Sequence, residues 1–167
     1  MMKHEATITK DLPGKTIHVT RAFDAPLEKV WRAWTERDIL DQWWAPKPWT
    51  IETKTLDFRP GGIWHFCMMN EAGERYWWRV NYETIDPLIS IATSGGVCDE
   101  DGNHPDNLIP MRRLTEFSSS GTGTIVRITI LFEKESDLHL MVEKGMLAGT
   151  TMVFNNLDEL FEKSMVN

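Results

Sequence analysis

The hydrophobic pattern of this chain begins with a period of two and then changes to a helical period. In the stretch TIHVTRAF, residues 16–23, apolar residues alternate with polar or small ones, which predicts a half-buried strand. Apolar residues at helical spacing follow in residues 24–44, with Asp24 as the expected N-cap and Pro26 in the first turn. A second short helix is expected to begin near Thr35. The pattern therefore predicts one strand followed by two short helices.

The period returns to two between residues 50 and 132. Turn sequences such as Pro-Gly-Gly at 60–62 divide this region into about six strands, which predicts an antiparallel meander. Residues 94–110 are too polar and too rich in Gly and Pro for regular structure, so we expect a mobile loop there. One face of the predicted sheet is strongly aromatic, because one parity collects Trp64, Phe66, Met68, Tyr76, Trp78, Val80 and Tyr82.

The last segment, residues 135–163, has a period of 3.6 and is long enough to cross a small domain as one helix. Asn156 lies within its apolar stripe, and a polar amide on an apolar face needs a hydrogen-bond partner. The stripe that we expect to pack on the sheet consists of Leu138, Val142, Met146, Gly149, Val153, Leu157 and Leu160.

This order of elements predicts the α+β class. We expect a strongly curved antiparallel sheet of about seven strands, wrapped around the long C-terminal helix, with two short helices after the first strand. Residues 1–15 are polar and are expected to form a flexible leader, and residues 16–163 a single domain. Side chains do not fill a sheet bent around one helix everywhere, so a cavity is expected between sheet and helix, closed at one end by the short helices.

Composition and charge argue against several classes of partner. Lys and Arg number 18 and Asp and Glu 25, so the net charge is −7, which repels phosphate backbones and anionic lipid headgroups. We therefore expect neither a nucleic acid nor a membrane as partner. The first residues have no apolar core of signal-peptide length, and no window approaches the roughly 20 apolar residues of a membrane span. A cytoplasmic location is expected.

The sequence contains no recognisable cofactor or metal motif. Glycine-rich phosphate-binding and dinucleotide-binding patterns are absent, as are those of serine hydrolases and zinc proteases, so we expect no cofactor. Cys67 and Cys98 are far apart in sequence and are expected to be reduced thiols. His65 and Cys67 form an H-x-C pair, but two ligands without a third do not make a metal site.

Four segments resemble a known family: HVTRAFDAPLEKVWRAWTERDILDQWWAP, FRPGGIWHFCM, YETIDPLI and EKGMLAGTTMVFNNLDELFE. They lie within roughly residues 16–162 and are similar to the family related to the activator of the heat-shock protein 90 ATPase, in the START-like, or SRPBCC, superfamily. The resemblance implies the helix-grip fold of that superfamily. The last helix of the family often has Gly-Trp where Gly149 is followed by Thr150 in this sequence, and this difference leaves the ligand class open.

The tryptophan-rich corner DQWWAPKPW, residues 41–49, is expected to close one end of the cavity. Trp43 and Trp44 have two interpretations, a plug at the end of the core and a lid over the cavity, and one ring can serve each. The aromatic face of the sheet either fills the core or lines a pocket, and the family resemblance favours the pocket. The candidate ligand-binding residues are Trp43, Trp44, Trp64, Phe66, Met68, Trp78, Tyr82, Met111, Arg113, Met152 and Asn156.

Three of these candidates are polar and can orient a ligand. Arg113 either points inward, sharing its parity with Met111, as the counter-ion of an anionic group, or lies in solvent together with Arg112 at the start of a strand. Tyr82 offers a hydroxyl, and Asn156 offers an amide that donates and accepts. Pairing with neighbouring residues would satisfy Tyr82 and Asn156 equally well.

Three hypotheses for function follow. The first is a protein that binds a small hydrophobic or aromatic ligand without necessarily transforming it. The second, by analogy with the family, is a co-chaperone-like interaction module with a chaperone partner. The third is an enzyme, a cyclase or hydrolase, in the same cavity, with Tyr82 or His139 as the candidate acid–base residue, although no catalytic constellation is visible.

The outward face of the predicted sheet leads to an expectation about assembly. It is more apolar than the surface of a monomer normally is, so we expect a homodimer through this face. The residues concerned are His65, Cys67, Met69 and Trp77.

Overall fold

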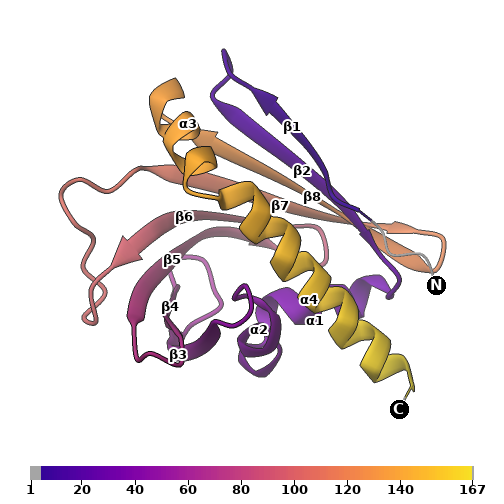
Figure 1. Ribbon diagram of the computed structural model, residues 1–167. Helices are drawn as coiled ribbons and strands as arrows, with labels where there is room; N and C mark the ends of the chain where they lie inside the picture. Colours follow the sequence, from indigo (N-terminus) through magenta and orange to yellow (C-terminus); the bar gives the residue numbers. More distant parts are fainter. Residues whose placement is uncertain (1–4, 167) are drawn as a thin grey trace.

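One curved antiparallel sheet forms the frame of the molecule (Figure 1). The computed structural model describes residues 5–166, with side chains up to residue 163, and within them the sheet has eight strands in the order β1-β2-β8-β7-β6-β5-β4-β3. The strands are β1 Thr7–Asp11, β2 Thr16–Phe23, β3 Thr50–Leu56, β4 Ile63–Met69, β5 Arg75–Asp86, β6 Ser90–Cys98, β7 Met111–Ser120 and β8 Gly123–Phe132.

Helices lie on the concave side of this sheet. In the described part of the chain they are α1 Leu27–Thr35, α2 Arg37–Trp43, α3 Glu135–Glu143 and α4 Met146–Val166. The two short helices α1 and α2 lie together at one end of the sheet, and α4 crosses in front of it (Figure 1). The predicted α+β class, curved sheet and pair of short helices are confirmed.

The two short helices begin slightly later than the sequence predicts. Ala25 precedes a proline and is therefore biased to extended backbone, so the N-cap of α1 is Pro26 instead of Asp24. Glu36 is also extended (φ −100°, ψ 128°) and separates the two helices, so α2 begins at Arg37 and not at Thr35. The buried side chains of this pair are Val30, Ala33, Trp34, Leu40 and Trp43.

The predicted six-strand meander corresponds to β3–β8. Each of these strands pairs antiparallel with its neighbour in the chain. The register shifts between Thr53 and Thr55 in the β3–β4 pair and between Tyr82 and Thr84 in the β5–β6 pair. Such bulges bend a strand and increase its twist, which is how this half of the sheet curves inward.

The eighth strand comes from the segment expected to be a flexible leader. Residues 7–11 form β1, which pairs antiparallel with β2 along its whole length. Prediction failed here because an edge strand buries little: Ile8 is half-buried, and the remaining residues of β1 are exposed. Residues 1–4 of the expected leader lie outside the described residues.

The segment 94–110 is only partly the expected loop. Its first five residues belong to β6, which continues to Cys98. The following residues lie against the outer face of the sheet, where Lys54 donates to the Glu100 carbonyl (2.8 Å) and Arg79 to the Gly102 carbonyl (3.0 Å). Donors from β3 and β5 thus hold the backbone of this loop on the sheet.

This loop changes the expectation for the outward face. Nε2 of His65 lies 3.1 Å from the Asp99 carbonyl oxygen, and the side chain of His65 packs against Trp77. His65 is only 4% exposed and Cys67 is 0% exposed. The premise that both residues lie on an open apolar surface is therefore wrong, because the chain's own residues cover them. The homodimer stays a prediction.

The C-terminal segment is two helices and not one. α3 ends at Glu143, and Gly145 has a φ of +91°, the left-handed conformation that commonly terminates a helix. The period of 3.6 predicts one continuous helix through Gly145, although a glycine at this position is also a stop signal. The longer second part, α4, is the helix that crosses the concave face (Figure 1).

A buried ion pair attaches α4 to the sheet. Nη2 of Arg21, in β2, donates to Oδ2 of Asp158 at 2.5 Å, and Nη1 donates to Oδ1 of Asn155 at 3.3 Å. The Arg21 side chain is 0% exposed and that of Asp158 is 10% exposed. The rings of Phe154 and Phe161 contact Phe23 beside this pair, at 5.8 and 5.9 Å. These contacts place α4 over β2.

The amide of Asn156 finds the partner that its place in the apolar stripe requires. Nδ2 donates to the carbonyl oxygen of Ala45 at 2.9 Å and lies 3.4 Å from that of Trp43. Both carbonyl groups belong to the tryptophan-rich corner, so Asn156 attaches this corner to α4.

We predict that replacing Asp158 with Ala destabilises the protein by about 3–5 kcal/mol, because the charge of Arg21 would stay buried without its carboxylate. Urea denaturation measures the change. The matched control is Glu159→Ala, which removes the neighbouring carboxylate from an exposed pair with Lys47 and should cost less than about 1 kcal/mol. Equal costs for the two variants would contradict the anchoring role of Asp158.

Candidate functional site

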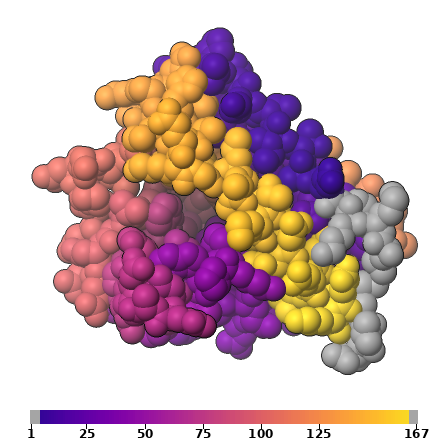
Figure 2. All heavy atoms as spheres, viewed as in Figure 1, coloured from indigo at the N-terminus to yellow at the C-terminus, as the bar shows by residue number. Residues whose placement is uncertain are grey.

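A cavity of about 210 Å³ lies between the concave face of β4–β7 and the helices α1 and α2. The space-filling view shows a hollow between the C-terminal helices, drawn orange and yellow, and the magenta and salmon segments opposite them (Figure 2). The cavity is lined by Trp34, Leu40, Trp44, Trp64, Phe66, Met68, Trp78, Val80, Tyr82, Ile91, Thr93, Ser94, Gly95, Met111, Arg113 and Thr115.

The apolar wall of the cavity is held in place by hydrogen bonds. Trp64 stacks on Phe66 with 4.2 Å between ring centroids, and Trp44 meets the edge of Trp64 at 5.2 Å. Nε1 of Trp64 donates to the hydroxyl of Thr53 (3.1 Å), which donates to Oδ1 of Asp41 (2.5 Å). This chain of bonds from β4 through β3 to α2 fixes the ring of Trp64, so the wall is preformed.

The two adjacent tryptophans of the corner have different positions. Trp43 is 0% exposed, donates from Nε1 to the Ala33 carbonyl (2.9 Å) and packs against Trp34 at 4.7 Å. Trp44 is the C-cap residue of α2 and lines the cavity. Trp43 is thus the plug at the end of the core, and Trp44 is part of the cavity wall.

A polar row crosses the floor of the cavity. Tyr82 of β5 is opposite Thr93 of β6, and Thr93 is opposite Arg113 of β7. Because directly opposed residues of antiparallel strands have neighbouring side chains on one face, these three groups lie side by side in the cavity.

The next row of the floor contains a gap. It runs from Trp64 through Val80 and Gly95 to Met111. Gly95 has a φ of +136°, and a Cβ atom on it would lie 2.1 Å from the carbonyl oxygen of Arg79. Only glycine fits this position, because a side chain would collide with the backbone of β5.

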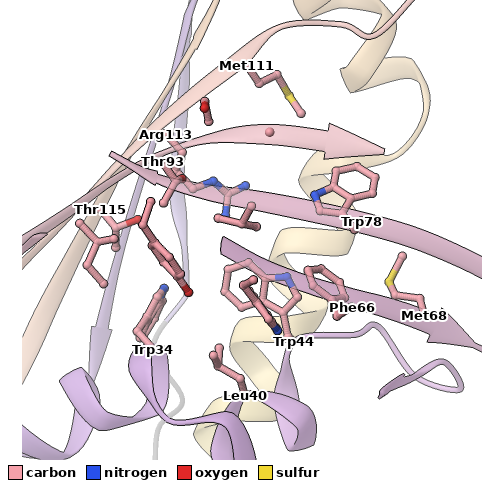
Figure 3. A pocket seen from close by; sticks show the side chains of 16 residues that line it. Trp34, Leu40, Trp44, Phe66, Met68, Trp78, Thr93, Met111, Arg113 and Thr115 are labelled. Carbon is pink, nitrogen blue, oxygen red and sulfur yellow. The ribbon is translucent and has the colours of Figure 1, made fainter. Parts of the chain in front are cut away.

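Arg113 is the residue that gives the cavity its charge. Its guanidinium points into the cavity (Figure 3) and its Cζ atom is 5.8 Å from the centroid of the Trp44 ring. Burial lowers the pKa of Arg113 to about 10. Within the described part of the chain, no carboxylate forms an ion pair with it. Arg112, by contrast, is exposed and pairs with Glu83 at 3.1 Å, so the solvent-facing alternative holds for Arg112 only.

Two further donors face the cavity without a protein partner. Nε1 of Trp34 is buried and has no hydrogen-bond partner among the described residues. The hydroxyl of Tyr82 likewise forms no hydrogen bond with a described residue, and burial raises the pKa of Tyr82 above its usual value. Tyr82 therefore keeps its proton at neutral pH and can donate it in a hydrogen bond.

Most of the predicted ligand-binding residues come together in this cavity. Those that line it are Trp44, Trp64, Phe66, Met68, Trp78, Tyr82, Met111 and Arg113. The other three lie elsewhere: Trp43 is in the core, Met152 is 42% exposed on α4, and Asn156 is bonded to the corner. Met152 lies outside the cavity because α4 packs over β2. None of the lining residues that the structure describes comes from α3 or α4.

Several lining residues were not predicted. Val80 and Thr115 share the inward parity of Tyr82 and Arg113, so alternation alone could have found them. The residues from β6 could not be found in this way, because the sequence gives no register for that strand. The full set that was missed is Trp34, Leu40, Val80, Ile91, Thr93, Ser94, Gly95 and Thr115.

The other candidate chemistry lies outside the cavity. His139 is on the exposed side of α3, with its Nε2 3.6 Å from Oε1 of Glu135, and does not line the cavity. In the described ranges, no three His, Cys, Asp or Glu side chains are placed to hold a metal ion. No helix of the described residues is long and apolar enough to span a membrane.

Comparison with known families supports the resemblance seen in the sequence. The family model described as "Activator of Hsp90 ATPase homolog 1-like protein" matches residues 24–162. The chain belongs to this family. The description of the family names an activator of the Hsp90 ATPase. A search of curated proteins returned no match.

Solved structures confirm the fold of this chain. Protein Ms6760 from Mycobacterium smegmatis is 24% identical, with a TM-score of 0.85 over 93% of this chain and 96% of its own. A protein from Arthrobacter aurescens is also 24% identical, with a TM-score of 0.87 over 94% and 91%. The AHSA1 protein SPO3351 from Silicibacter pomeroyi is 19% identical, with a TM-score of 0.71 over 89% and 99%. At these identities the similarity concerns the fold alone.

We predict that replacing Arg113 with Met raises the free energy of unfolding of the ligand-free protein by about 1 kcal/mol, because it removes a half-buried charge that has no carboxylate partner among the described residues. With a pKa of about 10, the guanidinium is charged at neutral pH, so the gain is fully present there and declines as the pH rises through about 10.

The measurement is urea denaturation of protein refolded from urea, which removes bound small molecules. Arg112→Met is the matched control, and its unfolding free energy should change by less than about 0.5 kcal/mol because Arg112 is exposed. A loss of stability in Arg113→Met would show that the guanidinium is satisfied by the protein itself.

Proposed function

We propose that this protein binds a small apolar or aromatic molecule in the cavity between β4–β7 and α1–α2. The observation that carries the proposal is a preformed aromatic wall around about 210 Å³ of space. Ligand sites are typically concave and mostly apolar, with a few polar groups that orient the ligand. Pockets for drug-sized molecules usually enclose about 300–1,000 Å³, so the size of this cavity favours a compact ligand.

The way the cavity is kept open supports a binding role. An unfilled apolar space lowers stability, because its lining side chains lose contacts that a filled core would give them. In this protein the hydrogen bond that holds Trp64 fixes one wall of the space, and Gly95 adds no side chain to the floor. A ligand would restore the missing contacts.

The titratable groups favour binding over acid–base catalysis. Among the lining residues, those that can titrate are Tyr82 and Arg113. Burial raises the pKa of Tyr82 and leaves that of Arg113 at about 10, so neither group changes its protonation state near neutral pH. General acid–base catalysis works best with a pKa close to the operating pH.

A chaperone partner is the second candidate, and the family description favours it. If the protein acts on a chaperone, an exposed surface carries the function and the cavity does not. The two proposals differ in what should be found in the cavity of protein taken from cells.

We expect native mass spectrometry of protein purified gently from its own host to show an excess mass of one small molecule for each chain, absent from the denatured mass. The cavity has room for one compact ligand and its wall is preformed. Extraction would then identify the molecule. Protein that consistently has the apo mass would argue for the interaction module, and the next experiment would be a search for a chaperone partner.

The two adjacent tryptophans of β5 provide a matched pair of variants. Trp78→Ala removes a ring from the cavity wall and should weaken binding of 2-naphthol by about tenfold or more in isothermal titration calorimetry. Trp77→Ala removes a ring that packs on His65 at the outer face and should leave the affinity unchanged. Equal effects of the two variants would mean that 2-naphthol does not bind in the cavity.

A further inference from the structure

We infer that the natural ligand of this cavity is a compact aromatic carboxylate, whose anionic group pairs with Arg113 and whose ring lies against Trp44 and Trp78. The inference rests on the proposed function, because it names the class of molecule that the same cavity binds. Three observations carry it: the charge of the lining, the supply of donors and the arrangement of the rings.

The first observation is the charge of the lining. Arg113 is the one ionic residue among the described lining residues, and no Asp or Glu is among them. The protein as a whole has a net charge of −7, so a cationic cavity opposes the overall balance of the chain. A half-buried guanidinium without a carboxylate has lost part of its hydration, and an anionic ligand would offset this cost.

The second observation is that each of the polar groups facing the cavity can donate a hydrogen bond. The hydroxyl groups of Tyr82 and Thr93 stand in the same row as Arg113. Nε1 of Trp34 is a buried donor with no partner in the described part of the protein. A carboxylate is acceptor-only and offers about four lone-pair sites, which matches this set. A guanidinium also binds a carboxylate in a bidentate geometry, which fixes the orientation of the ligand.

The third observation is the position of the rings relative to the charge. In the close view, the guanidinium of Arg113 extends over Trp44, and Trp78 and Phe66 lie beyond it on the same side (Figure 3). A ligand whose carboxylate meets Arg113 therefore places its apolar part among these rings. The volume of about 210 Å³ fits one ring or two fused rings better than a long acyl chain.

The test compares 2-naphthoate with 2-naphthamide, which has the same ring system and nearly the same shape but no charge. Isothermal titration calorimetry on the full chain at neutral pH should give at least about tenfold tighter binding of 2-naphthoate. In Arg113→Met this preference should disappear, because the affinity for 2-naphthoate falls to that for 2-naphthamide. Arg113→Lys, which keeps the charge but lacks the planar fork, should retain part of the preference.

Arg112→Met is the matched control, since Arg112 is the neighbouring arginine on the outer face and should not affect either probe. Circular dichroism and urea denaturation establish that each variant is folded before its affinity is compared.

Two results would overturn the inference in different ways. If 2-naphthoate and 2-naphthamide bind the wild-type protein equally well, or if Arg113→Met keeps the preference, the ligand is not selected by an anion–arginine pair, while cavity binding itself stands. If neither probe binds and the protein from its host has the apo mass, both the inference and the proposed function fail.

Discussion

The arrangement of this molecule depends on where α4 lies, and the ion pair between Arg21 and Asp158 determines that position. A buried guanidinium requires its carboxylate at hydrogen-bond distance, so the pair admits little sliding of the helix along the sheet. It holds α4 over β2, so α4 contributes no lining residue opposite the inner face of β4–β7 among the described residues. The short helices and the tryptophan-rich corner form the opposite wall, and Asn156 joins that wall to α4. The cavity exists because one helix covers only half of a curved sheet.

Within that uncovered half, the sheet is built in rows of contrasting chemistry. One row offers the donors of Tyr82, Thr93 and Arg113, and the next is apolar with a gap at Gly95. This combination of a positioned cation and an empty apolar space is not needed to stabilise the fold, since ordinary core side chains would do so at lower cost. The fold of the family supplies the frame, and these rows set the chemistry of the cavity in this member.

The sequence predicted most of the fold and part of the site. Alternation identified the meander and the inward parity of its aromatic residues, because a half-buried strand has a strong period of two. It missed β1, since an edge strand exposes most of its side chains. Arg21 was overlooked although it shares the buried parity of Ile17 and Val19, because a charge in that register is informative only once its partner is known. Met152 was predicted to line the cavity but is exposed. The helical period shows which residues share a face of α4, but it does not show where α4 lies on the sheet.

The crowding of tryptophans has an optical consequence. Trp34 contacts Trp43 at 4.7 Å, Trp43 contacts Trp44 at 5.1 Å, and Trp44 contacts Trp64 at 5.2 Å, so an unbroken series of indole rings connects three rings of the cavity lining through Trp43 in the core. At such separations, excitation absorbed by one ring transfers rapidly to the next. The emission of the whole series therefore depends on the surroundings of the rings that border the cavity, which are Trp34, Trp44 and Trp64. The protein contains its own fluorescent reporter of whether that space is occupied.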